Sequence, residues 1–93
     1  MTVVTNVRLR PADDHHRRIG IRWWVSLTVN GIQVRGITVR KTKGGYPVIC
    51  YPEDRSRRRR QPIPIVRPAN AEVRRAIEGA IVTELAWLTR EEE

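Results

Sequence analysis

The sequence predicts a small α+β domain, in which an antiparallel sheet of four to five strands carries one C-terminal α-helix packed on it. Three observations support this prediction. Apolar and polar residues alternate in runs across residues 3–39, the dipeptide Asn30-Gly31 separates two such runs, and residues 71–88 carry an apolar stripe of helical spacing. The 93 residues suffice for one modest core, so we expect residues 1–93 to form a single domain.

The first two strands are predicted where residue types alternate with a period of two. In residues 3–10 the set Val3, Thr5, Val7 and Leu9 alternates with Val4, Asn6, Arg8 and Arg10, and this strand is expected to end at Pro11. The polar residues 12–18 are expected to form a loop. Residues 19–29 form the clearest alternating run of the chain and predict the second strand.

The third and fourth strands follow a tight turn. Asn30-Gly31 favours a hairpin, because both residues tolerate the positive φ that a two-residue turn requires. The alternation changes phase in the next run, residues 32–39, and Gly36 at the switch predicts a β-bulge. Residues 46–51 are expected to form a fourth strand, and Pro47 near its start favours an edge position.

The C-terminal part predicts a loop, a short extended piece and a helix. Residues 52–62 form a polar, basic loop, and residues 63–66 are expected to be extended. Asn70 is a favourable N-cap, and the helix is expected to run from about 71 to 88. Residues 90–93 are expected to form a frayed acidic tail. The stripe of this helix consists of Val73, Ala76, Ile77, Ala80, Ile81, Leu85 and Leu88.

Charge is the outlying feature of the composition. The chain has 18 Lys and Arg against 10 Asp and Glu, a net charge of +8. Residues 1–75 hold 17 basic and 5 acidic groups, whereas residues 76–93 hold one basic and five acidic groups. A basic body with an acidic tip suggests a polyanionic partner on one surface.

Three basic groups are candidates for phosphate contacts, because arginine donates two parallel hydrogen bonds to a phosphate. The first is the arginine-rich loop, with Arg55, Arg57, Arg58, Arg59 and Arg60. The second is the turn after the third strand, with Arg40, Lys41 and Lys43. The third surrounds the helix start, with Arg67, Arg74 and Arg75. The alternative is that these side chains are only solvated.

The tryptophans differ in their expected roles. Because neighbouring residues of a strand face opposite sides, Trp23 is expected in the core and Trp24 on the polar face. Trp24 beside Arg22 could stack on an unpaired base, or it could pack at a subunit interface or under a loop. Trp87, late in the helix, is expected to pack.

The remaining chemistry is sparse. Cys50 is the single cysteine, so an intrachain disulfide is excluded, and His15-His16 has no matching His/Cys cluster to complete a metal site. No nucleophile and base pair is visible, so we expect neither an enzyme nor a cofactor nor a small-molecule substrate. No run is apolar enough to span a bilayer, and we expect a cytoplasmic protein without a membrane partner.

Several segments together carry a family resemblance. They are Val4–Arg10, Val25–Val29, Val34–Val39, Gly45–Pro52 and Pro68–Asn70, in this order and at similar spacing. On these segments the chain resembles the SpoVG family, the stage V sporulation protein G or septation proteins of bacteria. The resemblance covers residues 3–88.

The resemblance implies a small antiparallel sheet with a C-terminal helix, a homodimer, and site-specific DNA binding, with RNA binding in some members. Members of the family regulate gene expression and have roles connected with sporulation and cell division. Arg55 best matches the basic residues that follow the proline after the fourth strand in the family. Glu53-Asp54 stands where the family often has Lys-Arg, and the run at 57–60 is not usual in it.

The sequence therefore predicts a homodimeric regulatory protein that binds DNA, and RNA as a second ligand, through its arginine-rich loop. Exposed edges of short strands also favour a second copy as a partner, because pairing across a twofold axis would cover them. The rival hypothesis is a protein-interaction adaptor whose basic loop docks an acidic partner.

Overall fold

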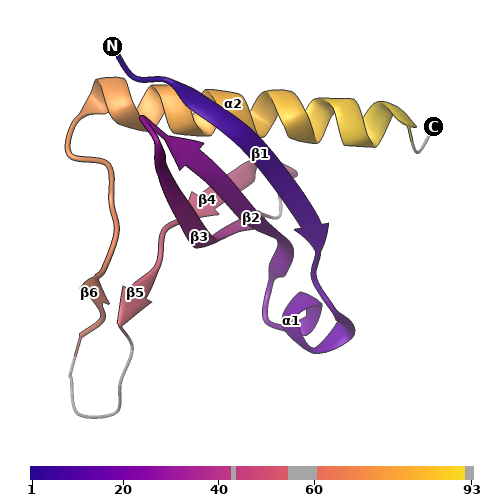
Figure 1. Cartoon of the computed structure of the whole chain (residues 1–93). Helices are drawn as coiled ribbons and strands as arrows, with labels where there is room; N and C mark the ends of the chain where they lie inside the picture. Colours follow the sequence, from indigo (N-terminus) through magenta and orange to yellow (C-terminus); the bar gives the residue numbers. More distant parts are fainter. Residues whose placement is uncertain (43, 55–60, 92–93) are drawn as a thin grey trace.

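The computed structural model describes residues 1–42, 44–54 and 61–91 and has an α+β architecture, as the sequence predicts. Four strands form an antiparallel sheet in the order β1-β2-β3-β4, and a long helix, α2, runs along it (Figure 1). The sheet comprises β1 (Val4–Pro11), β2 (Ile21–Val29), β3 (Ile32–Lys41) and β4 (Pro47–Cys50), and α2 spans Ala71–Glu91.

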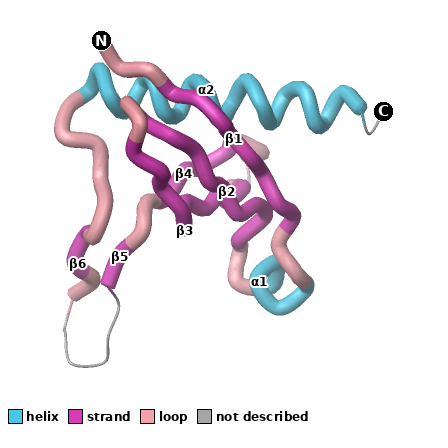
Figure 2. Tube along the Cα trace, in the orientation of Figure 1, coloured by secondary structure: helices cyan, strands magenta, loops and turns pink. Residues whose placement is uncertain are grey.

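Three small elements complete the fold. The short helix α1 (Asp14–Arg18) connects β1 to β2, and β5 (Glu53–Asp54) pairs with β6 (Ile63–Pro64) in a separate two-stranded sheet. Figure 2 shows that α1 and the β5–β6 pair stand away from each other, on either side of the four-stranded sheet. Residues 63–66 are predicted to be extended, and the structure has a strand, β6, at the first two of them.

The turn between β2 and β3 confirms the hairpin prediction. Asn30 has φ 47° and Gly31 has φ 84°, the two positive values that a type I′ turn requires. The predicted bulge at Gly36 is also present. Arg35 and Gly36 lie together opposite the single residue Ser26, and Gly36 has φ 86°. A Cβ atom at Gly36 would lie in ordinary van der Waals contact with Cγ of Pro52, at 3.4 Å, so the positive φ rather than lack of space favours glycine here.

Two expectations for the N-terminal third are wrong. The alternation of β1 is interrupted at Asn6, where φ is 52° and the pairing register with β2 shifts. Val7 then packs against the core together with Val4, whereas Val3 is 50% exposed. Residues 12–18 also do not form a plain loop. Asp13 caps α1 by accepting a hydrogen bond from the amide N–H of His16, so this polar segment closes a helical turn.

One face of the sheet and one stripe of α2 enclose the core. Ile77 and Ile81 of α2 are buried as the helical spacing predicts, and Trp23 packs at the margin, as do Val73 and Leu85. The buried cluster consists of Val25, Leu27, Ile37, Val39, Ile77 and Ile81. Each buried aliphatic side chain contributes about 1.5–3 kcal/mol by leaving water, so this cluster is the main source of stability in the described fold.

The ends of α2 confirm one expectation and correct another. Asn70 accepts a hydrogen bond from the amide N–H of Val73 at 3.0 Å and is the N-cap. The helix continues through residues 90 and 91, which were expected to belong to a frayed tail, whereas 92–93 lie outside the described residues. In the part of the chain that the structure describes, no helix has both the length and the apolar composition needed to cross a membrane.

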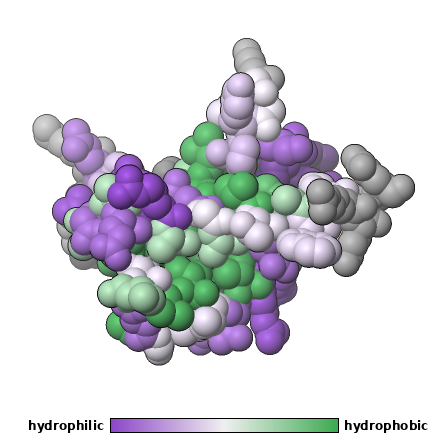
Figure 3. All heavy atoms as spheres, turned by 90° about the horizontal axis from the view of Figure 1, so that it is seen from above, coloured by the Kyte–Doolittle hydropathy of each residue, from purple (hydrophilic) through white to green (hydrophobic). Residues whose placement is uncertain are grey.

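Not all apolar side chains are covered. Seen from above, the surface includes a continuous apolar area with hydrophilic residues around it (Figure 3). Trp87 is 60% exposed on α2, so the expectation that it packs is wrong. Ile32, at the start of β3, and Ile65, directly after β6, are also exposed, at 68% and 66%.

A polar contact joins the end of the sheet to α2. The hydroxyl of Tyr51 donates a hydrogen bond to Oε2 of Glu78 at 2.9 Å, and Nε of Arg74 lies 3.8 Å from the same oxygen. Partial burial raises the pKa of Tyr51 above its ordinary value of 10.0, and the hydrogen bond to the Glu78 carboxylate raises it further.

We expect Tyr51→Phe to lower the free energy of unfolding by about 1 kcal/mol, because the carboxylate of Glu78 loses its donor. The raised pKa means that this contribution is complete below pH 10.0 and is lost as the pH rises further. Denaturant titrations across this range should therefore show a shallower alkaline decline in the variant. Tyr46→Phe is the control, since Tyr46 is 73% exposed. Equal alkaline profiles for wild type and Tyr51→Phe would contradict the assignment.

Candidate nucleic-acid interface

The residues that the sequence singles out for phosphate contacts fall into three places. Lys43 and the arginine-rich loop, with Arg55, Arg57, Arg58, Arg59 and Arg60, lie outside the described residues. Arg40 and Lys41 end β3. Nη1 of Arg40 donates a hydrogen bond to the carbonyl oxygen of Ile19 at 2.9 Å, so this guanidinium also stabilises the connection between α1 and β2.

The third basic group lies at the other end of β3. Arg67 and Ile32, the first residue of β3, line one apolar cavity of about 340 Å³ between the hairpin end of the sheet and the start of α2. Arg74 pairs with Glu78 within α2, and Arg75 is exposed. The ten residues of β3 separate this group from Arg40 and Lys41, roughly 30 Å of extended chain. The structure therefore does not bring these two groups together.

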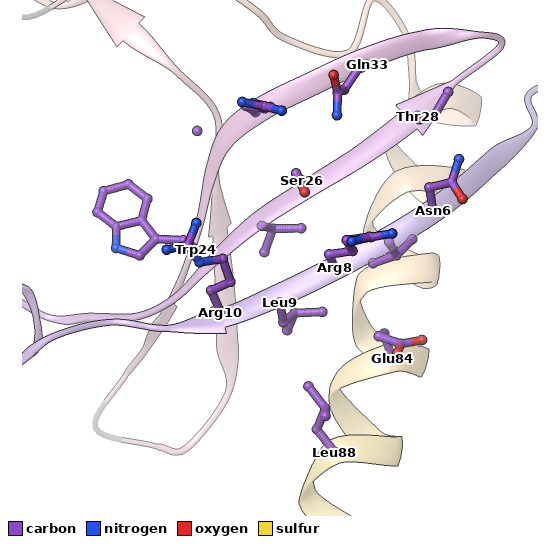
Figure 4. A pocket seen from close by; sticks show the side chains of 14 residues that line it. Asn6, Arg8, Leu9, Arg10, Trp24, Ser26, Thr28, Gln33, Glu84 and Leu88 are labelled. Atoms are coloured by element: carbon purple, nitrogen blue, oxygen red, sulfur yellow. The ribbon is translucent and has the colours of Figure 1, made fainter.

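A different set of basic residues does converge, on the face of the sheet that α2 leaves uncovered. We call this surface the open face and define it by Arg8 and Arg10 of β1, Trp24, Ser26 and Thr28 of β2, and Arg35 of β3. These residues line a groove of about 1170 Å³. Figure 4 shows Arg8 and Arg10 on one strand, with Trp24, Ser26 and Thr28 along the next.

The pairing register arranges the open face in rows across the strands. Arg10 lies opposite Trp24, and Trp24 lies opposite Thr38. In the next row Arg8 lies opposite Ser26, and the bulge puts Arg35 on the other side of Ser26. Residues two apart on a strand are separated by about 6.7 Å, so the two rows are neighbours on the same face.

The open face is cationic. Within the described part of the chain, no ion pair or side-chain hydrogen bond engages Arg8, Arg10 or Arg35. The groove extends past the edge of β1 to α2, where Glu84 lines it. Among the residues that line the groove, Glu84 carries the carboxylate. Three guanidinium groups with free donors on one surface attract anions, and phosphate oxygens match their geometry.

Trp24 is held from one side by α1. The rings of His16 and Trp24 meet edge to face, with centroids 5.1 Å apart and planes at 77°. The His16 ring is itself held by Asp13, whose Oδ1 lies 2.6 Å from Nδ1 of His16. The amide N–H of His16 and then its ring lower the pKa of Asp13 below its ordinary value of 3.8.

Arg8, Arg10 and Arg35 were overlooked at the level of the sequence, although a signal was available. Arg8, Arg10 and Trp24 occupy polar positions of two neighbouring strands, and Arg35 adjoins the phase change at Gly36. What the sequence lacks is the register, which decides that these positions meet.

The described residues contain no cluster of three or more His, Cys, Asp and Glu side chains that could hold a metal ion. His15 and His16 instead contact each other edge to face, at 5.3 Å between centroids.

Comparison of the chain with models of protein families finds no match, and comparison with curated proteins finds none. The residues of the open face therefore carry the functional argument.

We expect Asp13→Ala to release His16 and to change the surroundings of Trp24. The side-chain N–H resonance of the Trp24 indole should shift in NMR spectra of the variant. Asp14→Ala is the matched control, because Asp14 lies in the first turn of α1 without capping it. The lowered pKa means that the cap is intact above pH 3.8 and is lost as the pH falls through the folded-state value, so acid should shift the wild-type resonance in the same direction. A resonance that is unchanged in Asp13→Ala would contradict this coupling.

Proposed function

We propose that this protein is a regulatory nucleic-acid-binding protein, which contacts the phosphate backbone of DNA, and of RNA as a second ligand. The observation that carries the proposal is the convergence of Arg8, Arg10 and Arg35 on one groove of the open face. The net charge of +8 supports it, because non-specific affinity for nucleic acid comes mainly from neutralised phosphates. The arginine-rich loop at 55–60 is proposed as a second phosphate contact.

The open face also offers groups for contacts beyond charge. Ser26 and Thr28 carry hydroxyls, and Gln33, opposite Thr28, carries an amide. Such side chains donate to and accept from phosphates, sugars and base edges. Neither described helix is suited to read bases in the major groove of DNA. The helix α1 has only five residues, and α2 packs its apolar stripe on the other face of the sheet. Sequence preference would thus come from the sheet surface and loops.

We further propose that the protein acts as a homodimer and belongs to the regulators that the SpoVG resemblance suggests. An apolar cavity of about 340 Å³ opens between the β2–β3 hairpin and the segment before α2, and Ile32 and Val66, both exposed, border it. Exposed apolar side chains around a cavity favour association, because a second copy would remove them from water. This surface is separate from the residues that define the open face.

Three charge-matched variants test the phosphate contacts. Each replaces three arginines by glutamine: Arg8, Arg10 and Arg35 in the open face; Arg57, Arg58 and Arg59 in the loop; Arg67, Arg74 and Arg75 at the helix start. Affinity for a labelled duplex is measured across a salt series. We expect the slope of log K against log salt to fall by about 2–3 for the open-face and loop variants, at ~0.9 per lost contact. The helix-start variant should lose less than ~1, because none of its three arginines lines the groove of the open face and Arg74 already pairs with Glu78.

Because the three variants lose equal charge, a uniform loss would indicate non-specific attraction and would contradict a defined site. An open-face variant that binds like wild type would refute the open face as a phosphate contact. If wild type binds neither duplex nor single strands at low salt, the proposed function fails and the adaptor hypothesis takes its place.

Light scattering tests the homodimer. Wild type is expected to have twice the chain mass of 10.8 kDa at micromolar concentration. Ile32→Asp should shift it towards the monomer, because a carboxylate at the rim of the apolar cavity must be desolvated on association. Val82→Asp is the control, since Val82 is 45% exposed on α2 and does not line this cavity. A monomeric wild type, or equal shifts in both variants, would rule out this interface.

A further inference from the structure

We propose that the open face takes single-stranded nucleic acid, with one unpaired base stacked on Trp24 and the flanking phosphates on Arg10, Arg8 and Arg35. This inference rests on the proposed function and names the form of ligand that the site prefers. Its starting point is an anomaly. Trp24 is a large aromatic side chain on the face of the sheet that α2 does not cover, where the neighbouring positions are polar or basic.

The position of Trp24 suits stacking. Its side chain is partly buried by the edge-to-face contact with His16, and it also lines the groove. Figure 4 shows the indole at one end of the groove, next to Arg10. An aromatic ring that presents a face on a sheet surface is the usual platform for an unpaired base, and stacking there tolerates any base.

The ring is also held in place before any ligand binds. Asp13 holds the His16 imidazole at 2.6 Å, and that imidazole contacts the indole. Arg10 lies directly across from Trp24 on β1, and Thr38, which is buried, lies across from it on β3. The contact with His16 restricts the indole, so a stacked base would meet a ring of limited mobility and lose less entropy on binding.

The arginines lie where a strand passing over Trp24 would place its phosphates. Arg10 is in the same row as the indole, and Arg8 and Arg35 flank Ser26 in the next row, about 6.7 Å along the strand. A backbone that runs along β2 would meet Arg10 beside the stacked base and two further guanidinium groups beyond it. Combined stacking and backbone contacts are the recurring design of single-strand binding surfaces.

A duplex uses this arrangement poorly. Each base of a duplex is already stacked on both sides, so the face of Trp24 has no partner in it, and only the arginines would contribute. We therefore expect duplex affinity to depend on the arginines alone and single-strand affinity to depend on the arginines and on Trp24.

A second copy of the chain fits the open face less well. Across a twofold axis the same patch meets itself, so Arg8, Arg10 and Arg35 of one protomer would approach the same three arginines of its partner. Like charges in an interface oppose association. A polyanion instead complements all three.

The test compares Trp24→Ala, Trp24→Phe and Trp87→Ala with wild type, using labelled oligothymidine and a hairpin duplex of equal length as probes. Trp87→Ala is the matched control, because Trp87 is an exposed tryptophan outside the open face. Trp24→Ala should weaken oligothymidine binding by about fivefold to hundredfold, the loss of one base stack, and leave duplex binding unchanged. Trp24→Phe should retain most of the affinity and shows whether loss of the indole merely unfolds the domain.

The salt dependence separates the two contributions. Trp24→Ala should keep the wild-type slope of oligothymidine binding, because stacking releases no counterions, whereas glutamine at Arg8, Arg10 and Arg35 should lower it by about 2, at ~0.7 per contact with a single strand. If Trp24→Ala binds oligothymidine like wild type while the arginine variant does not, the stacking proposal is overturned and the proposed function stands. If wild type binds no nucleic acid, both fail. If Trp24→Ala instead changes the mass in light scattering and leaves the affinity intact, the open face is a subunit interface and the inference is overturned.

Discussion

The packing of a single helix against a single face of the sheet is the constraint from which the remaining architecture follows. Ile77 and Ile81 of α2 close the core over Val25, Leu27, Ile37 and Val39, and these side chains are among the most completely buried of the described residues. One helix covers one face. The opposite face of the same four strands meets solvent, and its side chains must be polar, charged or reserved for a partner.

Two irregularities in the strands keep the faces separate. In β1 the register shift at Asn6 turns Val7 towards the core and Arg8 towards solvent, and in β3 the bulge at Gly36 does the same for Ile37 and Arg35. If either strand kept a strict period of two, its apolar residue, Val7 in β1 or Ile37 in β3, would lie on the face away from the core. The bulges thus serve the core and, by the same geometry, gather arginines on the open face.

Trp24 is the large aromatic side chain among the residues that define the open face, and its environment is built by a neighbouring segment rather than by the sheet. Asp13 caps α1 and orients His16, and His16 contacts the indole. A five-residue helix has little stability of its own, so the cap at Asp13 is what maintains this arrangement. A surface aromatic held by a dedicated contact and flanked by arginines is well suited to a planar, anionic ligand.

The sequence by itself determined the fold class, the Asn30-Gly31 hairpin, the bulge at Gly36, the helix start at Asn70 and the burial of the α2 stripe. These features depend on local conformational preference and on the periodicity of apolar residues, both of which a single chain segment expresses. It also determined the basic character, although Lys43 and residues 55–60, on which the predicted site centred, lie outside the described residues. Only the tertiary structure decided that Arg40 and Arg67 lie towards opposite ends of β3, and that Arg8, Arg10 and Arg35 line one groove together with Trp24. Those outcomes depend on the pairing register between strands that are distant in sequence, and the register arises from the bulges and the shared core together rather than from any one segment.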